Sequence, residues 1–188
     1  MSKNLFNSAT IALIMFMLGG CAAMKEESSS STPAVEPMAA EVSAELYEVH
    51  KDGRIYIFYS HELYKEFLEM GHTAYSYNRI GAGPNGETLV YGLTGEDKKK
   101  RSGIPSVDLH DGKLKPTAFY GEAFIDGRIY VFDSVSEMEA VRAHHEAAYR
   151  LTDIGAGPKG ETVVYVLTSE NKKKRPEALI SKFKMMNK

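Results

Sequence analysis

Asp52-Gly53-Arg54-Ile55-Tyr56 and Asp126-Gly127-Arg128-Ile129-Tyr130 are the same five residues, 74 positions apart. The likeness continues along the chain without a gap: from Asp52 to Arg101, 26 of 50 residues are identical to the residue 74 positions later. So much identity at one fixed spacing cannot come from shared composition. The chain therefore contains a duplicated domain, and a site that both copies inherited has to use matched residues.

Each copy begins with a predicted β-hairpin. Tyr47 to His50 alternates apolar and polar residues, and Arg54 to Tyr59 is rich in Ile, Tyr and Phe, as half-buried strands are. The Asp52-Gly53 pair between them is typical of a two-residue hairpin turn. The second copy repeats this pattern from Glu122 to Asp133, around its own Asp-Gly pair.

A helix is predicted after each of these hairpins. Ser60 and Ser134 stand where an N-cap serine is expected, and Glu137, three residues after Ser134, completes a capping-box pattern. Gly71 is a suitable end for the first helix. The apolar residues at helical spacing are Tyr64, Phe67 and Leu68 in the first copy, and Met138, Val141 and Ala148 in the second.

A second hairpin completes each copy. In the first copy it consists of residues 74–80, a glycine-rich loop over 81–86, and a β-branched and aromatic run over 88–94. The unit is therefore β-β-α-β-β, and the fold class is α+β. A unit of about 55 to 60 residues buries about 60% of the surface of its unfolded chain, so its stability alone is marginal. We therefore expect the two copies to pack as a pseudo-symmetric pair.

The repeat also sets the expected domain boundaries. They are a signal peptide at 1–20, a lipidated N-terminus and flexible tether at 21–46, repeat domain 1 at 47–101, a linker at 102–120, repeat domain 2 at 121–175, and a C-terminal tail at 176–188. A short helix is expected over 39–46. A second is expected over 176–186, through Leu179, Ile180 and Phe183.

The N-terminus has the pattern of a secretory signal. Lys3 is the only charged residue among the first 20, and an apolar run of signal-peptide length follows from Ala9 to Leu18. Leu18-Gly19-Gly20-Cys21 resembles the lipobox of bacterial lipoproteins. The resemblance implies that Cys21 carries acyl chains such as palmitate and holds the protein at the cell envelope. Because Ala22 and not Asp follows, the outer membrane is favoured over the inner one if the source is Gram-negative.

Composition excludes some classes of protein. A net charge of -2 argues against a nucleic-acid binder, which usually carries a strong positive excess. Cys21 is the only cysteine, so a lipidated chain has neither a disulfide nor a thiolate metal ligand. None of the six histidines has a histidine 74 positions away. His144 and His145 could serve one copy only, and adjacent helical residues make a poor chelate.

The loop Gly81 to Gly86 matches the Gly-x-Gly-x-x-Gly pattern of dinucleotide sites, but a strand follows it where those sites need a helix. Its glycines suit a hairpin turn. Complete matching of this loop indicates either strict turn geometry or a shared contact surface. Arg54 and Arg128 are matched too, and pairing with Glu87 and Glu161 would be an ordinary explanation.

The matched residues that suit recognition form the candidate binding set. They are Arg54, Tyr56, Tyr75, Gly81, Gly83, Pro84, Glu87 and Tyr91 in the first copy, and Arg128, Tyr130, Tyr149, Gly155, Gly157, Pro158, Glu161 and Tyr165 in the second. The matched runs Lys98 to Arg101 and Lys172 to Arg175 are either solvated domain ends or contacts to an anionic lipid or envelope polymer.

The hairpin Asp52 to Ser60 followed by Phe67, and its counterpart Asp126 to Ser134, resemble the core of the YHS domain. This small domain is associated with metal-handling proteins. Tyr59 and Asp133 stand where that family has a cysteine, so the resemblance implies local architecture and not its thiolate metal site.

The sequence thus favours a non-catalytic binding or interaction module held at the envelope by a lipid anchor. Its expected partners are the membrane, through that anchor, and another envelope protein or an anionic envelope polymer. No catalytic residue, cofactor, metal ion or nucleic acid is predicted. The alternative is a metal-handling accessory lipoprotein with a YHS-like domain.

Overall fold

Both Asp-Gly pairs form the predicted turns. In the first hairpin Asp52 and Gly53 have φ angles of 53° and 70°, and in the second Asp126 and Gly127 have 50° and 75°. Two successive residues with positive φ form the turn whose twist suits a two-residue hairpin, and Asp-Gly adopts it readily. The hairpins thus begin each repeat as predicted.

The computed structural model describes residues 42–188. The signal peptide, the lipobox with Cys21 and most of the expected tether lie outside the described residues. The elements in chain order are β1 (Ser43–Lys51), β2 (Arg54–Phe58), α1 (His61–Met70), β3 (Tyr75–Arg79), β4 (Thr88–Leu93), a short 3-10 helix (Asp97–Lys99), α2 (Pro105–His110), β5 (Ala118–Ile125), β6 (Arg128–Phe132), α3 (Val135–His144), β7 (Tyr149–Asp153), β8 (Thr162–Leu167) and α4 (Glu177–Met186).

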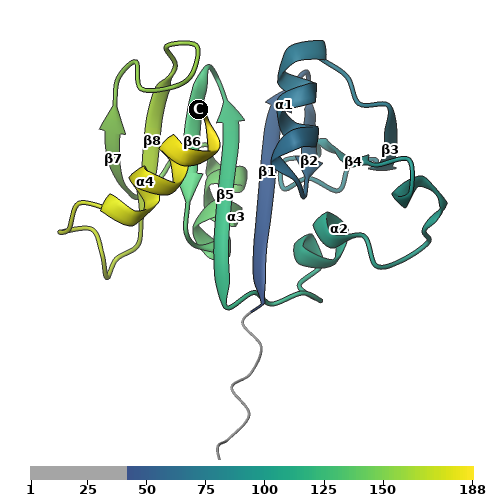
Figure 1. Ribbon diagram of the computed structural model, residues 1–188. Helices are drawn as coiled ribbons and strands as arrows, with labels where there is room; N and C mark the ends of the chain where they lie inside the picture. The colour runs from purple at the N-terminus through teal and green to yellow at the C-terminus, as the bar shows by residue number, and fades with distance from the viewer. Residues whose placement is uncertain (1–41) are drawn as a thin grey trace, which may run out of the picture. The chain divides into compact units, whose positions relative to one another are not determined.

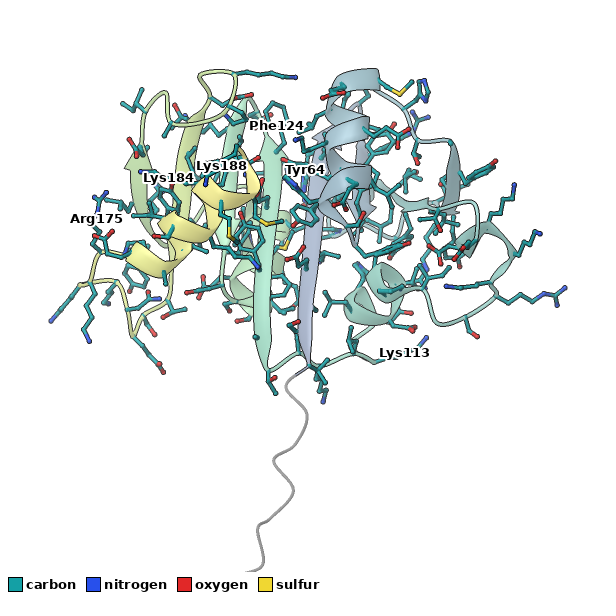
Figure 2. All side chains as sticks on the ribbon, in the orientation of Figure 1. Tyr64, Lys113, Phe124, Arg175, Lys184 and Lys188 are labelled. Carbon is teal, nitrogen blue, oxygen red and sulfur yellow. The ribbon has the colours of Figure 1, made fainter. Side chains whose placement is uncertain are left out.

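Serine caps start the first helix of each repeat, as predicted. The Ser60 hydroxyl accepts a hydrogen bond from the Leu63 amide at 3.3 Å, and the Ser134 hydroxyl accepts one from the Glu137 amide at 3.4 Å. α1 ends at Gly71, whose φ is 75°. On its buried face Tyr64 lies against β1 (Figure 2).

All eight strands belong to one mixed sheet in the order β3-β4-β2-β1-β5-β6-β8-β7 (Figure 1). The order reads the same from either end once β1 to β4 are matched to β5 to β8. The two repeats meet where β1 and β5 pair in parallel at the centre. The prediction of two β-β-α-β-β units packed as a pseudo-symmetric pair is therefore confirmed.

The register of the β1–β5 pair turns equivalent side chains of the two repeats to opposite faces of the sheet. Glu48 lies beside Ala123, an offset of 75, whereas equivalent residues are 74 apart. Because neighbours on adjacent strands share a face and successive residues alternate, an offset of one turns equivalent side chains to opposite faces. The pseudo-two-fold axis therefore runs along the strands.

The helices follow this inversion. Tyr64 and Phe67 of α1 join the core on one face of the sheet, and Met138 and Val141 of α3 join the core on the other. The face that each repeat leaves open is covered by the helix that follows it in the chain. α2 packs on the α3 face, and α4 packs on the α1 face through Leu179, Ile180 and Phe183 (Figure 1).

Three predictions of local structure need correction. Residues 43–46 begin β1 instead of ending a helix and tether, because they pair with β5 from Ala118 onward, and tertiary pairing overrides helix propensity. The expected linker 102–120 contains α2 and the start of β5. Ala148 lies beyond the end of α3. The C-terminal helix is confirmed. Within residues 42–188 no helix is both long and apolar enough to cross a bilayer.

A buried ion pair joins the two repeats. Glu48 on β1 is fully buried, and its Oε1 accepts a hydrogen bond from Nε of Arg142, on α3, at 2.8 Å. His50 Nε2 lies 3.2 Å from Oε2 of the same carboxylate. Burial alone would raise the pKa of Glu48, but the charges and hydrogen bonds of Arg142 and His50 outweigh it and lower the pKa to about 2.

Replacing Arg142 by alanine should destabilise the protein by about 3–5 kcal/mol, because Glu48 would remain buried without its partner. Arg150→Ala is the matched control: its bond to Glu146 is exposed, and its loss should cost less than about 1 kcal/mol. Urea denaturation of both variants measures the difference. Equal losses in the two variants would contradict the role given to the buried pair.

Candidate functional site

Two grooves are lined by residues at equivalent positions of the two repeats. Every residue that lines the second groove has a counterpart 74 positions earlier in the first, and five of these seven pairs are identical. The cavity volumes are about 450 Å³ and about 300 Å³. The identical pairs are Arg54 and Arg128, Tyr56 and Tyr130, Ile80 and Ile154, Thr88 and Thr162, and Val90 and Val164.

The three outer strands of each repeat form the floor of its groove. In the first repeat Arg54 on β2 lies beside Thr88 on β4. One row further along, Tyr56, Val90 and Asn78 are neighbours on β2, β4 and β3. The chain that leaves α1 forms a wall at residues 71–73. The second repeat builds the same rows on β6, β8 and β7. Secondary structure thus holds these side chains on a rigid surface.

The charge of both grooves is positive. Neither is lined by a carboxylate, and both contain an exposed arginine, Arg54 or Arg128, that forms no ion pair within residues 42–188. The first groove adds His72, and the second adds Arg150, which is bound to Glu146 at 2.9 Å. An unpaired guanidinium beside hydroxyl and amide side chains is suited to bind an anion.

An exposed isoleucine lines each groove. Ile80 is 90% exposed and Ile154 is 85% exposed, the two highest values among the large exposed apolar residues in the described part of the chain. Each follows the outermost strand of its repeat. Single apolar residues on a surface are ordinary, but the same residue, equally exposed, in the same groove of both repeats provides a duplicated apolar contact point.

The matched loop after each isoleucine is explained by its own architecture. The Glu87 carboxylate accepts a hydrogen bond from the Asn85 amide at 2.8 Å, and the Gly83 amide donates to the Glu87 carbonyl at 2.9 Å. A Cβ atom on Gly83 would lie 2.5 Å from Oε2 of Glu87, so only glycine fits. Gly81 has a φ of 66°. Gly155, Gly157 and Glu161 repeat the arrangement, and Pro84 and Pro158 lie exposed in the two loops.

The predicted ion pairs of Arg54 with Glu87 and of Arg128 with Glu161 are therefore wrong. Both carboxylates turn inward to close their loops and leave the arginines unpaired within the described residues. The sequence could not separate these roles, because loop closure and ligand binding both keep a residue identical in two copies.

The matched tyrosines have three different roles. Tyr56 and Tyr130 line the grooves, where Tyr56 is partly exposed and Tyr130 is buried. Tyr91 and Tyr165 are fully buried core residues. Tyr75 and Tyr149 lie on the edge strands, where the Nζ atoms of Lys98 and Lys172 stand 4.1 Å from the centres of their rings. The structure therefore brings together only Arg54 and Tyr56 of the first predicted set, and Arg128 and Tyr130 of the second.

The two basic runs are partly engaged within the fold. Besides the lysines over tyrosine rings, Lys100 pairs with Asp97 at 2.7 Å and Arg175 pairs with Glu177 at 3.0 Å. All eight basic residues are exposed. Contact with an anionic lipid or polymer through the others stays a prediction.

Nothing in the described residues adds to the metal-handling alternative. At the YHS cysteine position, the Tyr59 hydroxyl donates to Asp97 in the first repeat, and Asp133 is exposed in the second. No group of three or more His, Cys, Asp or Glu side chains within residues 42–188 is placed to hold a metal ion. The rings of His50 and His145 do meet across the repeats, 5.4 Å apart. No local sequence pattern indicates this contact, because it depends on the sheet register.

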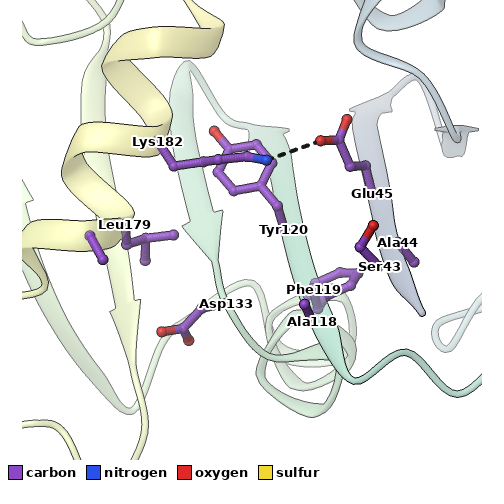
Figure 3. Close-up of a pocket in the computed structure, with 10 residues that line it drawn as sticks. Ser43, Ala44, Glu45, Ala118, Phe119, Tyr120, Asp133, Leu179 and Lys182 are labelled. Carbon is purple, nitrogen blue, oxygen red and sulfur yellow. Dashed lines mark hydrogen bonds and ion pairs between the residues drawn. The ribbon is translucent and has the colours of Figure 1, made fainter. Parts of the chain in front are cut away.

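A third cavity, of about 300 Å³, lies beside the central strands under α4 (Figure 3). Lys182 crosses it from α4, bonds Glu45 at 3.2 Å and stands over the Tyr120 ring. The Tyr120 hydroxyl donates to the buried Glu122 at 2.5 Å, and the Asn187 amide donates to the same oxygen at 2.8 Å.

Glu122 is the counterpart of Glu48, 74 residues later, but has no cationic partner within residues 42–188. Burial raises its pKa to about 7, despite the hydrogen bonds from Tyr120 and Asn187. Between pH 4.5 and pH 7 the folded chain holds a proton that the unfolded chain has released. The stabilising contribution of neutral Glu122 is therefore complete below pH 4.5 and is lost as the pH rises to 7.

Glu122→Gln should remove this loss, because glutamine can accept both hydrogen bonds and carries no charge. The variant should become more stable relative to the parent as the pH rises from 4.5 to 8, by up to about 3 kcal/mol. Urea denaturation across this range, with the exposed Glu139→Gln as control, measures the change. Parallel pH profiles for the parent and Glu122→Gln would contradict the assignment.

Comparison with known proteins provides no indication of function. No family model, no curated protein and no solved structure matches the chain. The resemblances to the lipobox and to the YHS hairpin therefore stay predictions from sequence. The two equivalent grooves are the features that best combine exposure, charge and identity between the repeats.

Proposed function

We propose that this chain is a lipid-anchored interaction module of the cell envelope, which binds a partner through two equivalent grooves and catalyses no reaction. The observation that carries the proposal is the duplication of the groove: each of the seven residues lining the second has its counterpart lining the first. Five of these seven pairs are identical, whereas no position of α1 is identical to its counterpart in α3. The residues that line both grooves are therefore more alike than the neighbouring helices, while the wall at 71–73, which lines only the first groove, differs.

The chemistry of the shared groove residues supports binding over catalysis. The five identical pairs supply an arginine, a tyrosine, a threonine and two aliphatic side chains. Both tyrosines are held in place by the fold. The centre of the Tyr56 ring lies 4.3 Å from that of Phe67, and the Tyr130 hydroxyl donates a hydrogen bond to the His145 carbonyl at 3.3 Å. Catalysis by a hydroxyl requires an adjacent general base, and the identical set contains none. Arginine and tyrosine are frequent at interfaces between proteins.

The membrane anchor is proposed from the N-terminal pattern. Acylation of Cys21 would attach the chain to a membrane, with the outer membrane favoured in a Gram-negative cell because Ala22 follows. Acyl chains anchor stably when two or more act together. The chain enters the described fold at Val42, immediately before β1.

Replacing Arg54 and Arg128 together by glutamine should abolish capture of the partner from solubilised envelope, because both grooves lose their unpaired guanidinium. We expect the amount of the captured species to fall roughly tenfold or more. The control is the pair Lys115→Gln and Lys184→Gln, which removes two exposed positive charges outside the grooves and outside both basic runs. Quantitative mass spectrometry of the eluates compares the two. An unchanged set of captured proteins in the groove variant would refute the proposed function.

Replacing Cys21 by serine should prevent lipid attachment. Cells expressing the parent chain and fed an alkyne-bearing fatty acid should yield labelled protein, and the Cys21→Ser variant should yield none. Gel fluorescence after dye coupling reads the label, and immunoblotting confirms that both chains are present. Equal labelling of the two chains would show that the lipid is not attached at Cys21.

A further inference from the structure

We infer that each groove takes an acidic peptide segment of a partner protein, and that the two grooves take segments from two separate molecules, so that one chain bridges them. This inference rests on the proposed function, since it names the partner chemistry and the geometry of the same grooves. Two observations carry it: the residues that the grooves share, and the opposite faces of the sheet on which the grooves open.

The shared residues fit a carboxylate next to an aliphatic side chain. Arg54 or Arg128 provides the charged donor, and the hydroxyl of Thr88 or Thr162 lies on the adjacent strand in register with it. A guanidinium can bind a carboxylate with two parallel hydrogen bonds. No carboxylate lines either groove, and the nearby Glu146 carboxylate is paired with Arg150.

The apolar part of each groove favours a peptide over an anionic polysaccharide. The floor contains a buried valine, and the exposed isoleucine beside it leaves a large aliphatic surface in water. Covering that surface is favourable only for a ligand that brings apolar atoms of its own. Arginine and tyrosine, which each groove contains, are enriched among the residues that dominate binding between proteins. A chain of sugar acids would use the arginine but leave Ile80 and Ile154 largely uncovered.

The two grooves open on opposite faces of the sheet. Tyr56, on the floor of the first groove, packs on Phe67 of α1, and Tyr130, in the second, belongs to the core that contains Met138 and Val141 of α3. α1 and α3 lie on opposite faces, so the grooves do too. β4 and β8, at the centres of the two floors, are also five strand positions apart in the sheet.

This separation sets what one partner can reach. At about 4.8 Å between strands, five positions correspond to roughly 24 Å across the sheet, and a ligand would also have to pass around an edge to the other face. A peptide segment that fills one groove cannot extend into the second. Two segments from two molecules can bind at the same time without meeting.

A sandwich binding assay tests the inference with the acylated chain held singly in lipid nanodiscs. The probe is the hexapeptide Gly-Glu-Leu-Glu-Glu-Gly, with Gly-Gln-Leu-Gln-Gln-Gly as the uncharged control. Immobilised probe captures the chain, and fluorescent probe in solution then reports the free groove. We expect about one soluble probe for each captured chain, and no capture by the uncharged control.

The single variants Arg54→Gln and Arg128→Gln separate capture from bridging. Each should still be captured through its intact groove, but should bind roughly tenfold less soluble probe, or less still, because the second groove has lost its charge. The control variant Lys115→Gln, which removes an exposed charge outside the grooves and the basic runs, should behave like the parent. Thermal unfolding of all variants in the same discs shows that the fold is kept.

Three results would overturn the inference, each in a different way. Equal capture by the charged and uncharged probes, or competition by polygalacturonate but not by polyglutamate, would exclude an acidic peptide as the ligand. Undiminished soluble probe on both single variants would show that the sites lie outside the grooves. A tandem peptide with two acidic segments that binds one to one and displaces both probes would exclude bridging. The proposed function is tested independently by the envelope capture experiment: it is refuted if the Arg54→Gln, Arg128→Gln double variant captures the same proteins as the parent.

Discussion

The parallel pairing of β1 with β5 is the constraint on which the rest of the structure depends. It joins two units, each of a size that is only marginally stable alone, into one sheet. Because its register differs by one residue from the spacing of the repeat, equivalent side chains face opposite ways. That single offset determines which face each helix covers, and it places Glu48 beneath α3, within reach of Arg142.

The same offset gives two equivalent glutamates unlike surroundings. Glu48 lies on the face of α2 and α3 and is held ionised by Arg142, whereas Glu122 lies on the face of α1 and α4, where burial raises its pKa to about 7. The position in α1 equivalent to Arg142 is Leu68, so only the second repeat has a cation at this position. The two halves of the core therefore share one strand order but shift the pKa values of equivalent carboxylates in opposite directions. Oppositely shifted carboxylates make stability depend on pH in both directions.

Local sequence chemistry was sufficient to predict the elements of each repeat. The Asp52-Gly53 turn, the Ser60 cap and the Gly71 end act over a few residues, and the structure places all three as predicted. The strand at 43–46 and the inversion of faces depend on pairing with a distant strand, which no local pattern encodes. α2 and α4 each cover the face of the sheet that the preceding repeat leaves open. No residue of α2 is identical to its counterpart 74 positions later, so sequence identity does not reveal that the two helices are equivalent.

The residues that are identical in the two repeats include part of the candidate site, but they also include residues that serve only the fold. Arg54 and Tyr91 are both retained in the second repeat, one in an open groove and one in the core. Glu87 is retained because it closes its own loop. Ile80 was matched in the sequence as well, but its importance depends on an exposure that a sequence does not give. Matching indicates constraint, and the structure is needed to say whether the constraint is geometry, packing or contact.

The two-fold relation about an axis along the strands has an evolutionary consequence. In a single repeat, β1 would be the edge strand of the sheet, with one side unpaired. A second copy, related by a two-fold rotation about an axis along the strands, would cover that edge by pairing its own β1 with the first. The present sheet thus has the symmetry of a homodimer fused into one chain. Fusion makes the pairing independent of concentration and frees each half to mutate alone. An ancestral dimer would have carried two identical grooves by symmetry, before any gene encoded both.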